Sequence, residues 1–161
     1  MKTIPGELIK VKEVEGSLDS ITDAANKLKS CSDESVSAIK SAVEEIKLNY
    51  KSSNRDAVIS RFSSCTSEYN SISNALTGTL KGIISSLRSL ISLIGELEKI
   101  NESIGKLESE KQRRIDSAKD DEKVDTSDLD SQISALEADF ESKKNAALSS
   151  LNQIKAMDAS V

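Results

Sequence analysis

Apolar residues recur every three or four positions along most of the chain, the spacing expected of one face of an α-helix. The first series lies within residues 7–48. Its members are Val11, Val14, Leu18, Ile21, Ala25, Leu28, Val36, Ile39, Val43 and Ile46. One extra step, through Ser32, separates Leu28 from Val36, and such a step locally unwinds a coiled coil without ending the helix. The pattern predicts one long first helix over 7–48.

A polar interruption follows at residues 49–56, with the sequence Asn-Tyr-Lys-Ser-Ser-Asn-Arg-Asp. Ser53 or Asn54 can cap a second helix, because a short polar side chain at that position accepts a backbone N–H of the first turn. Ser53 and Asp56 also have the spacing of a capping box. The sequence therefore predicts a turn at about 49–55 that joins two antiparallel helices into a long hairpin.

The second apolar series keeps the same spacing of three or four residues to about Ile115. It begins with Val58, Phe62, Cys65, Tyr69, Ile72, Leu76, Leu80, Ile83, Leu87, Leu90, Ile94 and Leu97. Gly78 and Gly82 interrupt it. Since glycine costs about 1 kcal/mol relative to alanine inside a helix, these two residues predict a bend or a close helix contact.

Between residues 83 and 94 the apolar residues cover more than one side of the helix, so this segment needs neighbours on two sides. A two-helix arm would bury only one of them. We therefore expect self-association or binding to another helical protein. The predicted partner interface consists of Ile83, Leu87, Leu90, Ile91 and Ile94.

A charged linker at 119–126 follows the hairpin, which spans 7–118. A third helix is predicted over 127–158, starting at a Ser127/Asp130 capping box and folding back on the distal half of the second helix. The predicted fold is thus all-α: a long antiparallel helical hairpin with a third C-terminal helix, packed as a coiled-coil-like bundle in one elongated domain, 1–161.

The composition argues against most catalytic, phosphate-binding and metal-binding sites. Hydrophobic residues make up 37% of the chain and aromatic residues 2%, with no histidine. There is consequently no imidazole base or metal ligand. The glycines lie within helical stripes and form no phosphate-binding loop. Two cysteines cannot complete a zinc site. We therefore expect no enzyme, no cofactor and no metal.

Charge and hydropathy narrow the choice of partners. The net charge is −5, whereas nucleic-acid-binding domains carry a basic face. The one dense basic cluster, Lys111, Arg113 and Arg114, is followed by acidic residues at 120–122 and is interpreted as a solvated helix face. The most apolar stretch, 83–94, is too short to cross a bilayer. We expect a soluble protein that binds no nucleic acid and has no membrane span.

Two cysteines, Cys31 and Cys65, lie on opposite arms of the predicted hairpin. They would be offset by roughly 10 Å along its axis at 1.5 Å per residue, too far for a disulfide within one chain. Both are predicted to be small apolar residues in the seam between the helices.

Residues 5–105 resemble the WXG superfamily, small helical hairpins exported by type VII secretion systems. Tyr50-Lys51-Ser52 stands where the family has Trp-x-Gly in its turn, and Ala57, Val58 and Phe62 follow at the small and apolar or aromatic positions of the second helix. Two signature residues differ, with Tyr in place of Trp and Ser in place of Gly. The long, aromatic-poor helical partners of LXG toxins are a related comparison.

The resemblance implies a non-catalytic secretion substrate, partner or chaperone that acts through helix–helix contacts and recognises its machinery or a toxin through Tyr50, Ser52 and Phe62. It implies a cytoplasmic protein that is then secreted or reaches the cell surface without a cleaved signal peptide. No Tyr-x-x-x-Asp/Glu export signal follows the hairpin, since Tyr69 is followed four residues later by Ser73. Export would therefore use a partner's signal, or the chain would be an accessory subunit. The alternative is a structural coiled-coil component of a phage, flagellum or cell surface.

Overall fold

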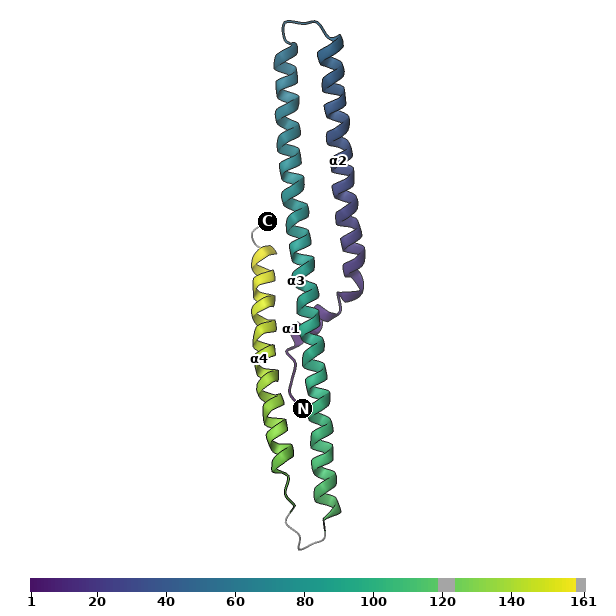
Figure 1. The fold of residues 1–161 in the computed structure, drawn as a ribbon. Helices are drawn as coiled ribbons and strands as arrows, with labels where there is room; N and C mark the ends of the chain where they lie inside the picture. The colour runs from purple at the N-terminus through teal and green to yellow at the C-terminus, as the bar shows by residue number, and fades with distance from the viewer. Residues whose placement is uncertain (119–123, 159–161) are drawn as a thin grey trace. The chain divides into compact units, whose positions relative to one another are not determined.

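The computed structural model describes residues 1–118 and 124–158, and its regular elements are all helical (Figure 1). They are α1 (Gly6–Lys12), the 3-10 turn η1 (Glu15–Ser17), α2 (Leu18–Asn49), α3 (Arg55–Ser117) and α4 (Ser127–Asp158). The all-α prediction is confirmed. Of the predicted charged linker 119–126, residues 119–123 lie outside the described residues, and 124–126 are non-helical.

The chain divides into two compact units where the sequence predicts one domain. The hairpin unit is Ser17–Ile84, which contains α2 and the first part of α3. The terminal unit joins Met1–Gly16 to Ser85–Val161, and so contains α1, the rest of α3 and α4. Helix α3 is continuous and contributes to both units.

The predicted turn between the two arms of the hairpin is confirmed, because α2 ends at Asn49 and α3 begins at Arg55. Tyr50 leaves the helix in an extended conformation, and its N–H still donates to the Ile46 carbonyl at 3.0 Å. Neither Ser53 nor Asn54 supplies a described side-chain cap, and Ser52 makes hydrogen bonds within the turn. The Ser52 Oγ accepts the Asn54 N–H at 3.3 Å, and its carbonyl accepts the Arg55 N–H at 3.1 Å.

The prediction of one unbroken helix over 7–48 is wrong. Helix α1 ends at Lys12, and the chain passes through η1 before α2 begins at Leu18. Gly16 lies in this break, where the low helix propensity of glycine makes an interruption less costly. The apolar spacing from Val11 to Val14 to Leu18 hides the break, since it continues across without change.

The core of the terminal unit forms where α4 packs on the distal part of α3, as predicted. The N-terminal segment also packs there, which the sequence did not predict. Phe140 on α4 and Leu8 on α1 are both fully buried there. The other core members are Leu90, Ile94, Leu97, Ile100, Ile104, Ala147 and Leu151. Ion pairs border this core, and one joins the Lys143 Nζ to the Glu96 Oε2 at 2.6 Å. The Lys143 ammonium holds the pKa of the Glu96 carboxyl below its usual value.

Helix α3 runs through Gly78 and Gly82 without interruption. Neither glycine has a positive φ, and a Cβ built at either one would meet no atom within 4 Å. The predicted close helix contact at these residues is therefore wrong within the chain, and neither position needs glycine for conformational reasons.

Candidate functional site: the apolar face of the hairpin

The interior of the hairpin unit mixes small or polar side chains with larger apolar ones. On α3 the buried positions include Thr66, Ser73 and Thr77, and on α2 they include Ala25 and Ser32. The remaining buried residues of this seam are Leu18, Val36, Val43 and Ile84. A seam of this kind buries little apolar surface, so it contributes less hydrophobic stabilisation than a Leu/Ile seam of the same length.

Several large apolar side chains of the hairpin lie outside this seam. Those on α3 are Val58, Phe62, Tyr69, Ile72 and Leu76, with exposures of 38%, 47%, 47%, 67% and 40%. Ile21 and Leu28 on α2 are 43% and 46% exposed. Both cysteines are also exposed and free, so the prediction that Cys31 and Cys65 are seam residues is wrong.

The exposed stripe on each helix is offset from the buried stripe by one residue. Ile72 precedes the buried Ser73 on α3, and Cys31 precedes the buried Ser32 on α2. One residue corresponds to a rotation of about 100° on an α-helix. Because the two helices are antiparallel and their seams face each other, an offset of the same sense turns both stripes toward the same side of the hairpin.

We call this side the apolar face. Its α2 members are Ile21, Ala24, Leu28, Cys31, Ala38 and Ala42, and its α3 members are Val58, Phe62, Cys65, Tyr69, Ile72 and Leu76. The stripe position between Cys31 and Ala38 is Ser35. No charged residue occupies a stripe position between Ile21 and Ala42 or between Val58 and Leu76.

The opposite side of the hairpin is polar. The residues that directly follow the buried positions within the unit are Asp19, Asn26, Asp33, Ser37, Glu44, Ser67, Asn74 and Gly78. A cleft of 290 Å³ opens between the helices, and Lys40, Glu44, Lys47 and Ser67 are among the residues that line it. The hairpin is therefore amphipathic as a unit, with one apolar and one polar side. A docking surface for another helix has this distribution.

The residues predicted as a turn motif have separate positions. Tyr50 lies in the turn and is 55% exposed, and Ser52 is occupied in closing that turn. Phe62 lies two helical turns into α3, on the apolar face. The Arg55 guanidinium also closes the turn by donating to the Lys47 carbonyl at 3.4 Å, a contact that the sequence did not indicate.

Three of the five residues predicted as a partner interface are covered by the chain itself. Leu90 and Ile94 belong to the core of the terminal unit, at 0% and 1% exposure, and Ile91 is 7% exposed. Ile83 and Leu87 are partly buried. The broad stripe does need neighbours on two sides, but α1 and α4 provide them for Leu90 and Ile94. Leu90, Ile91 and Ile94 therefore do not remain as a surface for a second protein.

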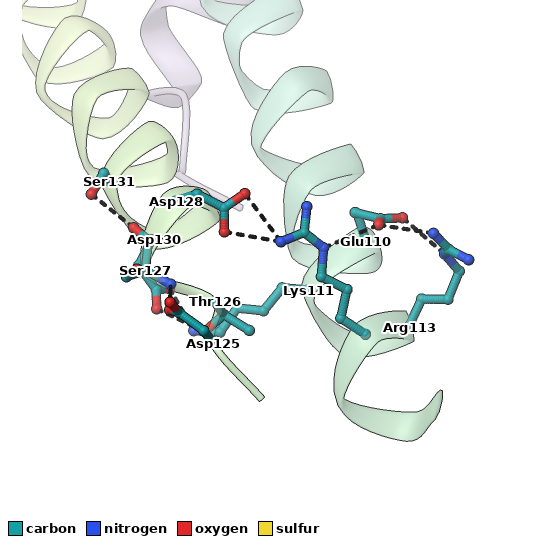
Figure 2. Close-up of polar contacts among 10 residues, drawn as sticks. Glu110, Lys111, Arg113, Asp125, Thr126, Ser127, Asp128, Asp130 and Ser131 are labelled. Atoms are coloured by element: carbon teal, nitrogen blue, oxygen red, sulfur yellow. Dashed lines mark hydrogen bonds and ion pairs between the residues drawn. The ribbon is translucent and has the colours of Figure 1, made fainter. Parts of the chain in front are cut away.

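In the basic cluster of α3, Lys111 and Arg114 pair with carboxylates at the start of α4, and Arg113 pairs with Glu110 of its own helix (Figure 2). The Lys111 Nζ lies 2.5 Å from the Asp130 Oδ1, and the Arg113 Nε lies 2.8 Å from the Glu110 Oε2. The Arg114 Nη1 donates to both Asp128 oxygens, at 2.9 and 3.0 Å. Every member of the cluster therefore has a carboxylate partner in the structure.

These pairs shift the affected pKa values in the directions expected of charge-assisted hydrogen bonds. The Arg113 guanidinium lowers the pKa of Glu110, and the Lys111 ammonium lowers the pKa of Asp130. Hydrogen bonds from Ser127 lower the pKa of Asp125. The predicted Ser127/Asp130 capping box needs correction, since the Ser127 N–H donates to the Asp125 Oδ1 at 2.9 Å and Asp130 pairs with Thr126.

Within residues 1–118 and 124–158, no three His, Cys, Asp or Glu side chains gather in a group that could hold a metal ion. Over the same residues, no helix has the length and hydropathy needed to cross a membrane. The chain matches no family model, no curated protein and no solved structure. The apolar face is the candidate functional site of the described residues.

Proposed function

We propose that this protein is a non-catalytic helix-docking protein that binds a helical partner through the apolar face of its hairpin. The observation that carries the proposal is that α3 buries short polar side chains between the helices and exposes large apolar ones. Thr66, Ser73 and Thr77 are buried between the helices, while Phe62 and Tyr69 are nearly half exposed. Folding a hairpin alone would favour the reverse arrangement, because burial of the larger apolar groups contributes more free energy.

The size of the face supports the same conclusion. Large side chains expose on the order of 200 Å² each when uncovered. Seven of them at 38–67% exposure present roughly 600 Å² on this face before the alanines and cysteines are added. A standard protein–protein interface buries about 800 Å² on each partner, so most of such an interface is available on one side of this hairpin.

We further propose that the partner belongs to a type VII secretion system, with this chain as a substrate, partner or chaperone. The resemblance to the WXG superfamily supports this, as does the exposed Tyr50 in the turn between two long helices. A structural coiled-coil component would use the same face, but it would place no demand on the turn.

Partner recovery from the native host tests the docking function. Ile72→Asp places a charge on the apolar face, and Ser71→Asp places the same charge one residue earlier on the same helix. We expect the wild type and Ser71→Asp to recover the same helical partner and Ile72→Asp to lose it, with helix content equal by circular dichroism. Equal recovery by all three chains would contradict the proposal.

Tyr50→Ala separates secretion from a purely structural role. Since Tyr50 is 55% exposed, its removal should change the free energy of unfolding by no more than about 0.5 kcal/mol. We expect export to fall while the melting temperature is unchanged. Unchanged export would remove the secretion assignment and leave the structural alternative.

A further inference from the structure

We propose that α3 and α4 form a docking site for an amphipathic peptide segment, and that residues 1–12 occupy this site as a removable strap. The partner segment that displaces the strap carries the same pattern of side chains: apolar residues at positions i, i+4 and i+7 between two lysines. The docking site lies within the terminal unit, so the proposal is independent of the apolar face of the hairpin.

The strap has three apolar anchors. Leu8 is fully buried in the core that α3 and α4 form, and Ile4 and Val11 pack against that core. These residues have the i, i+4, i+7 spacing by which amphipathic helices dock on other proteins. Ile9, the neighbour of Leu8, is 50% exposed. Leu8 is therefore the central anchor and the one buried residue of the strap.

A side chain of the docking site recognises the backbone at the start of the strap. The Asn101 side-chain amide accepts the Lys2 N–H and donates to the Lys2 carbonyl. Such a carboxamide pairs with the main chain and places no demand on the side chain at that position. Pro5 precedes α1, and its carbonyl accepts the Leu8 N–H at 3.0 Å. The docking site thus accommodates an extended stretch that leads into a short helix.

Ion pairs favour a segment with basic ends. Three of them join the strap to α3 and α4: Lys2 to Glu137, Glu7 to Lys155, and Lys12 to Glu98. The two outer pairs each set a lysine of the strap against a carboxylate of the docking site, and such complementarity selects among partners. Lys10 has no ion pair within residues 1–118 and 124–158, so it serves as an internal control for charge.

The strap is joined to α2 by an exposed connector. Residues 13–17 are all exposed, and they contain the break between α1 and α2. A helix of seven residues is too short to be stable alone, so α1 is helical because it is docked. Segments with few buried contacts open locally at a lower cost than the whole domain. The strap can therefore leave the docking site while α3 and α4 stay packed.

A labelled peptide tests whether the docking site accepts a segment from outside the chain. The probe has the sequence of residues 1–14 with a fluorophore at its carboxyl end, and its anisotropy is followed on titration with the full chain. Leu8→Asp in the chain expels the chain's own strap, whereas Ile9→Asp places the same charge on the exposed neighbouring position.

We expect the Leu8→Asp chain to bind the peptide about tenfold more tightly than the wild type, or better, because no strap competes for the docking site. The Ile9→Asp chain should match the wild type. A Leu8→Asp chain that keeps the helix content of the wild type and binds no peptide would overturn the proposal.

A cleavable connector provides a second test, which decides the matter if the Leu8→Asp chain does not fold. A protease recognition sequence inserted after Val14 lets the strap be cut from a chain that has already folded. We expect the labelled peptide to replace the cut strap, while the amides of α4 keep their protection from hydrogen exchange. Loss of protection throughout α4, or a cut strap that never exchanges, would show a permanent part of the core and overturn the proposal.

Two peptide variants test the chemistry of the partner segment. Lys12→Glu and Lys10→Glu change the net charge of the peptide equally, but only Lys12 faces a carboxylate, that of Glu98. At low salt, Lys12→Glu should weaken binding to the Leu8→Asp chain or to the cut chain several-fold, and Lys10→Glu should leave it unchanged. Equal affinities of the two variants would overturn the assignment of a partner with basic ends.

Discussion

The side chain of Asn101 pairs with both backbone polar groups of Lys2. The Lys2 N–H donates to the Asn101 Oδ1 at 2.9 Å, and the Asn101 Nδ2 donates to the Lys2 carbonyl at 2.8 Å. Asn101 is 7% exposed. One amide on α3 therefore holds the extended N-terminal segment that leads to Leu8, whose side chain fills the core of the terminal unit.

Asn101→Ala should release this segment. The loss of two partly buried hydrogen bonds is expected to cost about 1–3 kcal/mol, and hydrogen exchange of the amides in α1 should accelerate. Ser103→Ala is the control, because the Ser103 hydroxyl is exposed and donates only to the Lys99 carbonyl of its own helix. Equal protection of α1 in the two variants would show that the Asn101 hydrogen bonds do not anchor the segment.

The three-four rhythm predicts where the helices lie, because apolar spacing and polar breaks are local properties. It predicts the hairpin turn, the start of α4 at Ser127 and the packing of α4 on α3. The break after Lys12 is missed because the apolar spacing continues through Val14 to Leu18. Local spacing thus identifies helices better than it identifies their ends.

The same rhythm cannot tell which neighbour covers a stripe. Phe62 and Tyr69 look like seam residues in the sequence, but the structure turns them outward and buries Thr66 and Ser73. A signal for this arrangement does exist in the sequence. The buried stripe of α3 has its own three-four rhythm of short polar residues, which hydropathy alone does not reveal. For Leu90 and Ile94, the sequence predicts the packing of α4, and only the fold shows that α1 packs there as well.

The two phenylalanines provide a matched pair of substitutions. Phe140 is fully buried in the terminal unit, and Phe62 is 47% exposed on the apolar face. Phe140→Ala should lower the free energy of unfolding by about 3–5 kcal/mol, through lost burial and the cavity that remains. Phe62→Ala should have a much smaller effect on the free energy of unfolding and should weaken recovery of the helical partner instead. Denaturant unfolding and partner recovery with both variants measure the two effects separately. A large loss of chain stability from Phe62→Ala would contradict the assigned face.

Ser32 is expected to be a site of stabilising substitution. It is 3% exposed, and its Oγ has no hydrogen-bond partner among the described residues. An unsatisfied buried hydroxyl costs about 1–3 kcal/mol. Ser32→Ala should therefore raise the free energy of unfolding by roughly 1 kcal/mol. Ser35→Ala is the comparison, since Ser35 is exposed and bonded to the Cys31 carbonyl, and its effect should stay within about 0.5 kcal/mol. If Ser32→Ala is destabilising in thermal melts, the hydroxyl has a partner such as an ordered water.

The Lys111–Asp130 pair should make the attachment of α4 sensitive to pH. The Lys111 ammonium, and then the Thr126 hydroxyl, lower the pKa of Asp130 below its ordinary value of 3.8. A carboxyl whose pKa is depressed in the folded state stabilises that state above its unfolded pKa, and the contribution is lost as the pH falls through the folded value. The melting temperature of the wild type should therefore exceed that of Asp130→Asn at neutral pH, and the difference should shrink as the pH falls below about 3.9. When both chains also carry Lys111→Gln, the difference in melting temperature at neutral pH should be smaller, because the ammonium that lowers the pKa of Asp130 is gone. A difference that grows on acidification would mean that protonated Asp130 is the stabilising form.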